Sequence, residues 1–308
     1  MPEIHFHLPE DWTRDRARML PFYQKLTAGL PQQAQIRLVP IEREGLLDRI
    51  EAMAGVHIVN HGRVMHPRAL NAGIAYIYPF WHLDPSGIRA FSSIGEAVFR
   101  PSQVDGEVAR GFFRRLRGRL VEGRTSRYEQ PEEIADLGAM KAAVFLQSEG
   151  HRTVGETLYL DRWAMLRGVL EAVDGPVAVK PHPRDLDPET GDMLEALQAE
   201  YPHLVVTLAN IHDVIRAAER VVTINSAVGI EAYLHRKPVI LCGKADFHHI
   251  ATVAKTPEEL NRALRAVPEE RPYAKYIQWY FGERCLNAGA PDLVERFWAR
   301  LPPGQGGV

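Results

Sequence analysis

The sequence predicts an α/β protein built from two doubly wound, Rossmann-like domains that face each other across a central cleft. Short apolar segments of strand length alternate with amphipathic segments of helical length along most of the chain. Its 308 residues are enough for two domains of ordinary size. Hydrophobic residues make up 45% and charged residues 25%, a composition typical of a globular protein with a full core.

The N-terminal half is expected to alternate strands and helices with many loops between them. Strands are expected at residues 4–8, 36–39, 56–60 and 75–78. Helices are expected at 15–30, with a break or kink at Pro21, at 45–53 and at 104–121. Segment 81–95 is rich in turn formers, and the polar segment 122–137 is interpreted as a linker. The pattern favours an open parallel sheet in a first domain at residues 1–137.

The C-terminal half is far more regular. Strands are expected at residues 142–146, 177–180, 204–207, 221–224 and 238–242. Helices are expected at 160–173, 189–200, 212–218, 229–234 and 257–266. These β/α units predict a doubly wound second domain at residues 138–275. A helical segment at 276–308 is expected to pack back on the first domain.

Charge and composition exclude several classes of function. The net charge of -2 and a pI near 6.7 provide no overall field that would attract nucleic acid. No signal-peptide pattern and no long apolar run are present, so we expect a cytoplasmic protein. Cys242 lies in an apolar run and is expected to be a buried free thiol, which fits a reducing compartment.

Three potential cations follow the predicted strand at 177–180. Lys180, His182 and Arg184 alternate with Pro181 and Pro183. Proline fixes its own φ and keeps the preceding residue extended, so this turn is stiff. Cations held rigidly at the end of a strand suit a phosphate group. The alternative is a basic loop without a ligand.

A second motif lies between the predicted strand at 221–224 and the helix that follows it. Asn225, Ser226 and Gly229 are small or polar, and a phosphate can be bound by the Ser226 hydroxyl and the N–H groups that open the helix. Glu231, in the first turn, can accept hydrogen bonds from ribose hydroxyls. The alternative is an ordinary turn in which the helix dipole favours Glu231.

Two further segments offer groups for acid–base chemistry. Asp84 lies in a turn rich in proline and glycine, where it is either a catalytic carboxylate or a turn former. Glu149 and His151 follow the predicted strand at 142–146, and the alternative there is a polar surface loop. We expect no metal site, because His57 and His61 would stand about 13 Å apart on a strand.

The expected helix at 104–121 is rich in arginine. The side chains are Arg110, Arg114, Arg115, Arg117 and Arg119. They form either a solvated helix face or a contact with a lipid-phosphate acceptor or membrane surface.

Residues 177–256 resemble the capsule polysaccharide synthesis family of β-Kdo glycosyltransferases. The resemblance is carried, in this order, by segments 179–184, 222–232, 236–240 and 243–247. It implies a GT-B architecture and a CMP-activated sugar acid, usually CMP-Kdo, as the donor substrate. It also implies that His182 and Ser226 hold the CMP phosphate and that Glu231 holds the ribose. The His-Pro pair and this serine are also similar to the CMP-binding signatures of bacterial GT-B sialyltransferases.

The resemblance further implies how the two domains divide the reaction. The first would take the glycan or lipid-linked acceptor, and the second would bind the nucleotide sugar, with no other cofactor. The turn at Asp84 resembles the acidic turn of that family's N-terminal domain. Where related retaining enzymes show an aspartate nucleophile, this chain has His151, so a double displacement would need its nucleophile elsewhere. The alternatives are a UDP-sugar transferase or epimerase and a non-catalytic glycan-binding or assembly subunit.

Overall fold

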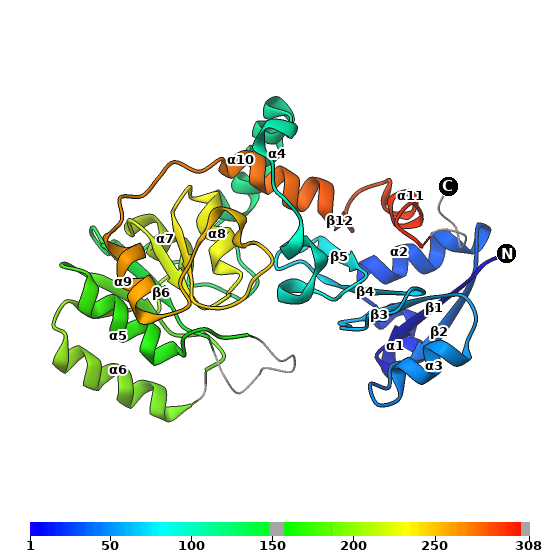
Figure 1. The fold of residues 1–308 in the computed structure, drawn as a ribbon, viewed down its shortest axis with the longest axis horizontal. Coiled ribbons are helices and arrows are strands. Elements are labelled where there is room, and N and C mark those ends of the chain that lie inside the picture. The colour runs from blue at the N-terminus through cyan, green and yellow to red at the C-terminus, as the bar shows by residue number, and fades with distance from the viewer. Residues whose placement is uncertain (148–156, 186, 303–308) are drawn as a thin grey trace. The chain divides into compact units, whose positions relative to one another are not determined.

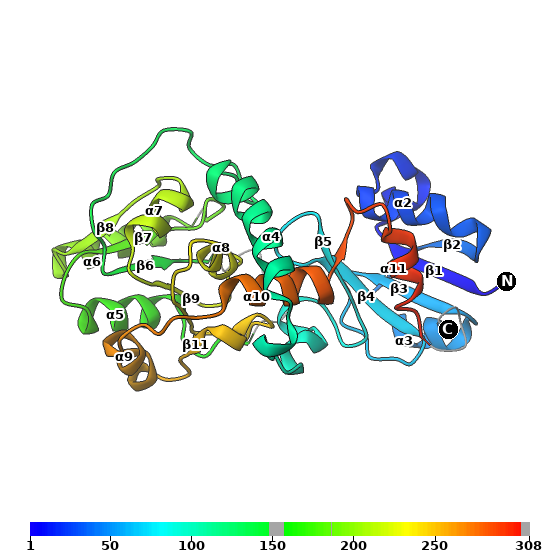
Figure 2. The same ribbon diagram turned by 90° about the horizontal axis from the view of Figure 1, so that it is seen from above.

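The computed structural model describes residues 1–147, 157–185 and 187–302. It divides into two compact α/β units, the first formed by residues 1–97 with those from 280 onward, and the second by residues 98–279. Figures 1 and 2 show the elements of both. The predicted boundary at 137 is therefore wrong. Residues 98–137 belong to the second unit because α4 (Gly106–Arg117) packs there beside α10 (Tyr273–Ile277) and α8 (Val228–Leu234).

The first unit contains a six-stranded sheet in the order β12-β5-β4-β3-β1-β2. The strands are β1 (Glu3–Leu8), β2 (Gln35–Pro40), β3 (Val56–Asn60), β4 (Ala69–Ile74), β5 (Phe80–Asp84) and β12 (Leu286–Asn287). Strands β1 to β4 pair in parallel, whereas β5 and β12 add an antiparallel edge. Through β12 and α11 (Leu293–Trp298), the C-terminal segment packs within this unit.

Three predictions for this unit are wrong. The strand expected at 75–78 is the turn between β4 and β5, where Tyr76 has a φ of 63° and the Ala75 N–H donates to the Phe80 carbonyl at 2.8 Å. Segment 81–95 was expected to consist of turns, but its first four residues, 81–84, belong to strand β5. In addition, Pro21 does not kink a helix but occupies the first turn of α2 (Pro21–Gly29), where its missing N–H has no cost.

The sheet of the first unit is covered on both faces. Ile4, Phe6 and Leu8 of β1 pack in one core with side chains of α2 and α11. A second, smaller core is formed by Val59 of β3 and Ala69 of β4 with Leu46 and Ile50 of α3 (Leu46–Ala52). Figure 1 shows α2 and α3 on opposite sides of the strands. Because side chains alternate along a strand, His5 and His7 point away from the first core.

Buried histidines occupy the positions between the apolar residues of β1. His7 Nε2 lies 2.9 Å from His57 Nδ1, and His57 Nε2 lies 3.2 Å from the Met53 carbonyl oxygen. The carbonyl can only accept, so His57 carries its proton on Nε2 and its Nδ1 accepts from His7. A second proton on His57, on Nδ1, would face the N–H that His7 donates, so this arrangement favours neutral rings.

Acid is expected to destabilise the protein through these rings. Burial lowers the pKa of His7 and of His57 from 6.5 to about 4, so in acid the unfolded chain binds protons that the folded state does not. The free energy of unfolding should be retained above pH 6.5 and fall by about 1 kcal/mol per pH unit for each ring as the pH drops toward 4. Urea denaturation across this range should show a shallower slope for His7→Gln than for wild type. The partly exposed His203→Gln is the control, and equal slopes for His7→Gln and wild type would contradict the prediction.

The second unit contains a six-stranded, fully parallel sheet in the order β11-β10-β9-β6-β7-β8. The strands are β6 (Ala142–Phe145), β7 (Val177–Lys180), β8 (Leu204–Val206), β9 (Val221–Thr223), β10 (Val239–Leu241) and β11 (Thr252–Val253). The strands predicted for this half are thus confirmed, with small shifts at their ends. The succession of strands reverses direction between β6 and β9, which is the topological switch point of a doubly wound sheet.

Helices cover both faces of this sheet (Figure 1). On one face, α5 (Arg162–Ala172), α6 (Pro188–Glu200) and α9 (Pro257–Arg265) share a core with the strands. On the other face lie α7 (Ile211–Ala217) and α8. Within the described ranges, no helix is both long enough and apolar enough to cross a bilayer. Cys242 is a buried free thiol, as predicted.

Candidate functional site

Two polar side chains bridge the switch point of the second sheet. The Gln147 amide, just after β6, donates to the Asn225 side-chain oxygen at 2.8 Å, and the Asn225 N–H donates back to Gln147 Oε1 at 3.0 Å. Asn225 Nδ2 also donates to the Lys244 carbonyl at 3.3 Å. In open α/β sheets, ligands bind beyond the carboxyl ends of the strands at this point. Asn225 therefore shapes the floor of the candidate site, and its amide is held by these partners.

His182 is oriented by its own loop and by a segment outside the predicted motifs. Its Nδ1 accepts a hydrogen bond from the Arg184 N–H at 3.1 Å, so the proton of the neutral ring is on Nε2. The imidazole lies edge-on to the Tyr128 ring, with centroids 5.0 Å apart. The Arg184 guanidinium lies 4.9 Å from the centroid of the same ring. Tyr128 thus organises two of the three predicted phosphate ligands.

Lys180, the third predicted cation, lies differently. Its ammonium donates to the Leu208 carbonyl at 2.9 Å, and the residue is only 6% exposed. Burial lowers the pKa of this lysine. Lys180 therefore joins β7 to the loop after β8, whereas Arg184 is exposed at the surface.

Glu231 is a buried carboxylate in the first turn of α8. It is 3% exposed, and burial raises its pKa from 4.5 to about 7. The Ser126 hydroxyl donates to Glu231 Oε1 at 2.6 Å and by itself lowers that pKa. This carboxylate is ready to accept hydrogen bonds from ligand hydroxyls, because a deprotonated carboxylate offers more acceptor positions than Ser126 uses.

The other residues of this motif have structural explanations. Ser226 Oγ accepts a hydrogen bond from the Val228 N–H at 3.4 Å. A Cβ at position 229 would lie 2.8 Å from the Phe247 ring, so Gly229 is required for packing. The ligand contacts proposed for Ser226 and Gly229 stay predictions.

Segment 122–137 supplies site residues that sequence reasoning missed. It was interpreted as a linker, but it is tied to the second unit: His212 Nε2 lies 2.9 Å from the Thr125 carbonyl oxygen, and Asn210 Nδ2 donates to the Pro131 carbonyl at 3.1 Å. These contacts bring Ser126 to Glu231 and Tyr128 to His182. The sole signal in the sequence was a serine and an aromatic residue within a polar stretch.

Asp84 ends β5 in the first unit and is 4% exposed. Its Oδ1 accepts from the N–H groups of Ser86 and Gly87 at 2.8 and 3.2 Å. Its Oδ2 accepts from the N–H and the hydroxyl of Ser93 at 2.9 and 2.7 Å. This geometry favours the turn-forming role, and a catalytic role stays a prediction. Glu149 and His151 lie outside the described residues.

The two doubly wound units define a GT-B architecture, and comparison with solved structures confirms this fold class. KpsC, a beta Kdo 2,7 transferase from Thermosulfurimonas dismutans, is similar with a TM-score of 0.59 and 15% identity, over 90% of this chain and 89% of that one. The beta Kdo 2,4 transferase of KpsC from the same organism is similar with a TM-score of 0.50 and 15% identity, over 84% and 89% of the two chains.

Residues 165–280 match the model of the family described as capsule polysaccharide biosynthesis protein, which confirms the predicted resemblance to the capsule polysaccharide synthesis family. No curated protein matches the chain. The matched segment contains His182, Asn225 and Glu231.

Proposed function

We propose that this protein moves Kdo or a related sugar acid from a CMP-activated donor to a surface glycan or glycolipid acceptor. The observation that carries the proposal is the buried Glu231 carboxylate, bonded to Ser126 and located beside the switch point within the family-matching segment. A ribose offers hydroxyl donors that a carboxylate in this position accepts, with the bonds strengthened by charge. Glu231 would therefore fix the nucleoside.

His182 and Arg184 would meet the phosphate of the donor. When the bond between the sugar's anomeric carbon and the phosphate oxygen breaks, negative charge grows on the departing CMP. The Nε2 proton of His182 and the Arg184 guanidinium are suited to stabilise that charge. In this proposal the protein's own cations suffice, so the donor sugar is handled without a metal ion or another cofactor.

The acceptor hydroxyl must lose a proton as its oxygen bonds to the anomeric carbon. Asp84 is the first candidate for the base that takes this proton, and Glu149 and His151 are the others. The CMP-sugar would be used in the cytoplasm. The exposed Arg110, Arg114 and Arg115 of α4 would be available to a lipid-linked acceptor or to the membrane surface.

CMP is expected to raise the melting temperature more than other nucleotides do. At about 100 times its dissociation constant, a ligand that binds only the folded state adds roughly 2.7 kcal/mol, which is several degrees for a unit of this size. A thermal-shift panel of CMP, CDP, UMP, UDP, GDP and ADP measures this directly. The response to CMP should disappear in His182→Ala, whereas His203→Ala is a control histidine substitution away from the site.

The same panel separates the alternatives. Stronger stabilisation by UDP than by CMP would contradict the CMP-sugar assignment and favour a UDP-sugar transferase or epimerase of the same fold. A response to none of the nucleotides would contradict donor binding and favour a non-catalytic glycan-binding or assembly subunit.

A further inference from the structure

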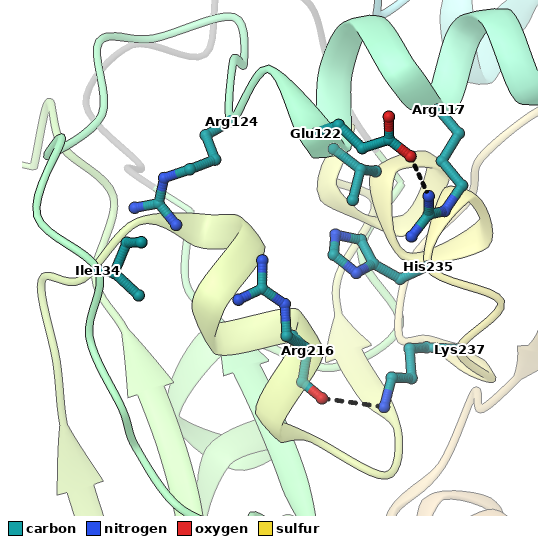
Figure 3. A pocket seen from close by; sticks show the side chains of 8 residues that line it. Arg117, Glu122, Arg124, Ile134, Arg216, His235 and Lys237 are labelled. Atoms are coloured by element: carbon teal, nitrogen blue, oxygen red, sulfur yellow. Dashed lines mark hydrogen bonds and ion pairs between the residues drawn. The ribbon is translucent and has the colours of Figure 1, made fainter.

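A pocket of about 350 Å³ lies in the second unit (Figure 3), and none of the residues predicted to bind the donor lines it. It is lined from four places: the end of α4 and the turn after it, Ile134 of the following loop, the end of α7, and the turn after α8. In a doubly wound sheet the helices run antiparallel to the strands. The ends of α7 and α8 therefore lie at the edge where strands begin, whereas His182 follows the end of β7 and Glu231 opens α8.

The lining of this pocket is strongly cationic. Arg117, Arg124, Arg216 and Lys237 contribute four positive charges. Two carboxylates oppose them: Glu122 pairs with Arg117 at 2.6 Å, and the buried Asp213 pairs with Arg124 at 2.5 Å and with Arg216 at 3.4 Å.

Four cations against two carboxylates leave two positive charges on the lining. A further carboxylate, Glu219, acts on Lys237 but is itself paired with Lys141 at 2.7 Å. The Lys237 ammonium donates one hydrogen bond to the Arg216 carbonyl, at 3.1 Å, and carries two more N–H groups. Figure 3 shows the side chains of Arg117, Arg216 and His235 around the same space. An anionic ligand would balance the remaining charge.

His235 adds an acceptor to this cationic lining. Its Nε2 lies 3.0 Å from His212 Nδ1, and His212 Nε2 lies 2.9 Å from the Thr125 carbonyl oxygen. Because the carbonyl can only accept, neutral His212 has its proton on Nε2, and its Nδ1 must accept from His235 Nε2. Burial, reinforced by His212, Arg216, Arg117 and Lys237, lowers the pKa of His235 to about 3, so its ring is neutral. The remaining nitrogen, Nδ1, is then an acceptor.

We infer that this pocket binds a small anionic carbohydrate, a sugar bearing a phosphate or a carboxylate. Arg216 and Lys237 would bind the anionic group, and a sugar hydroxyl would donate to His235 Nδ1. Arg124 would contribute positive charge to the pocket wall, because its guanidinium already donates to Asp213 and to the Glu133 carbonyl. Guanidinium groups suit both anions because they offer paired donors in one plane. The volume lies within the roughly 300–1,000 Å³ typical of small-molecule sites and exceeds what a bare phosphate ion fills.

Calorimetric titration of the full-length protein at low ionic strength tests the inference. The probes are glucose 6-phosphate, glucuronate, inorganic phosphate and uncharged glucose. We expect the protein to bind at least one of the two charged sugars, glucose 6-phosphate if it prefers a phosphate and glucuronate if it prefers a carboxylate. Uncharged glucose should not bind. Arg216→Gln and Lys237→Gln should each weaken that binding about ten-fold. The matched control is Arg115→Gln, an exposed arginine of α4 outside the pocket, and its affinity should equal that of wild type.

Two further variants locate the ligand and its hydroxyl. His235→Phe should weaken binding of the charged sugar while leaving inorganic phosphate unaffected, since it removes only the acceptor. His182→Ala should leave binding unchanged, and loss of binding in that variant would place the ligand at the donor motifs and overturn the inference. Equal weakening by Arg115→Gln, or no binding of either charged sugar to wild type, would overturn it as well.

Discussion

Replacing Glu231 by alanine is expected to weaken CMP binding by at least about 100-fold. Each hydrogen bond from a ribose hydroxyl to a carboxylate contributes roughly 1.5–3 kcal/mol, and a ribose presents two such hydroxyls. The side chain is buried and held by Ser126, so no other described carboxylate of α8 can substitute for it. Calorimetric titration of CMP into wild type and Glu231→Ala measures the loss. An unchanged affinity would contradict the ribose assignment.

The pH dependence of CMP binding provides a second test of the same residue. With a pKa of about 7, Glu231 is half protonated at neutral pH, and ribose hydroxyls need the ionised form. CMP affinity should therefore fall up to about ten-fold per pH unit below 7 and level off above it. Glu231→Gln should bind weakly without this pH profile. Ser126→Ala, which removes the partner that lowers the pKa, should shift the profile to higher pH.

Stability without ligand serves as the folding control for these variants. The pKa of Glu231 is higher in the folded protein than the ordinary value of 4.5. Protonated Glu231 therefore makes its full contribution to the free energy of unfolding below pH 4.5, and this contribution is lost as the pH rises through about 7. At pH 8, Glu231→Gln should be more stable than wild type by on the order of 1–3 kcal/mol. A variant that is more stable but binds CMP poorly cannot owe the defect to misfolding.

Asp84→Asn is expected to lower the free energy of unfolding by about 2–4 kcal/mol. Each carboxylate oxygen accepts two hydrogen bonds, from Ser86 and Gly87 on one side and from Ser93 on the other. An asparagine amide would turn its NH2 group toward one pair of these donors and leave buried N–H groups unpaired, at roughly 1–3 kcal/mol each. Urea denaturation compares the variant with wild type. Unchanged stability would contradict the turn-forming role.

The catalytic hypothesis for Asp84 makes a separate prediction. A lost general base lowers the rate of transfer by at least about 100-fold, even at a temperature where the variant is folded. Ser93→Ala is the matched control, because it removes one hydroxyl donor from Oδ2 and keeps the carboxylate. It should lose stability but keep kcat. Wild-type turnover in folded Asp84→Asn would show that Asp84 is not the base.

The second unit was largely predictable because its strands are buried on both faces. Segments such as 142–146 and 221–224 read as continuous apolar runs, and each is followed by a turn and an amphipathic helix. In the first unit, residues 75–78 are also apolar and mostly buried, but they form a turn. Their apolar residue types alone gave them the appearance of a strand. Strand β4, which contains Asn71 and Gly73, was missed because such residues are poor strand formers.

The sequence alone determined the fold class, the resemblance to the capsule polysaccharide synthesis family, and the positions of His182 and Asn225 just after strands and of Glu231 in the first turn of a helix. These properties depend on local order along the chain. Only the tertiary structure decided what their side chains contact. Ser126 meets Glu231 from 105 residues away, and Lys180 is directed to a backbone carbonyl. Arg117, Arg216 and Lys237 form one pocket because the ends of three elements converge. Such contacts depend on packing between distant segments, which no local pattern records.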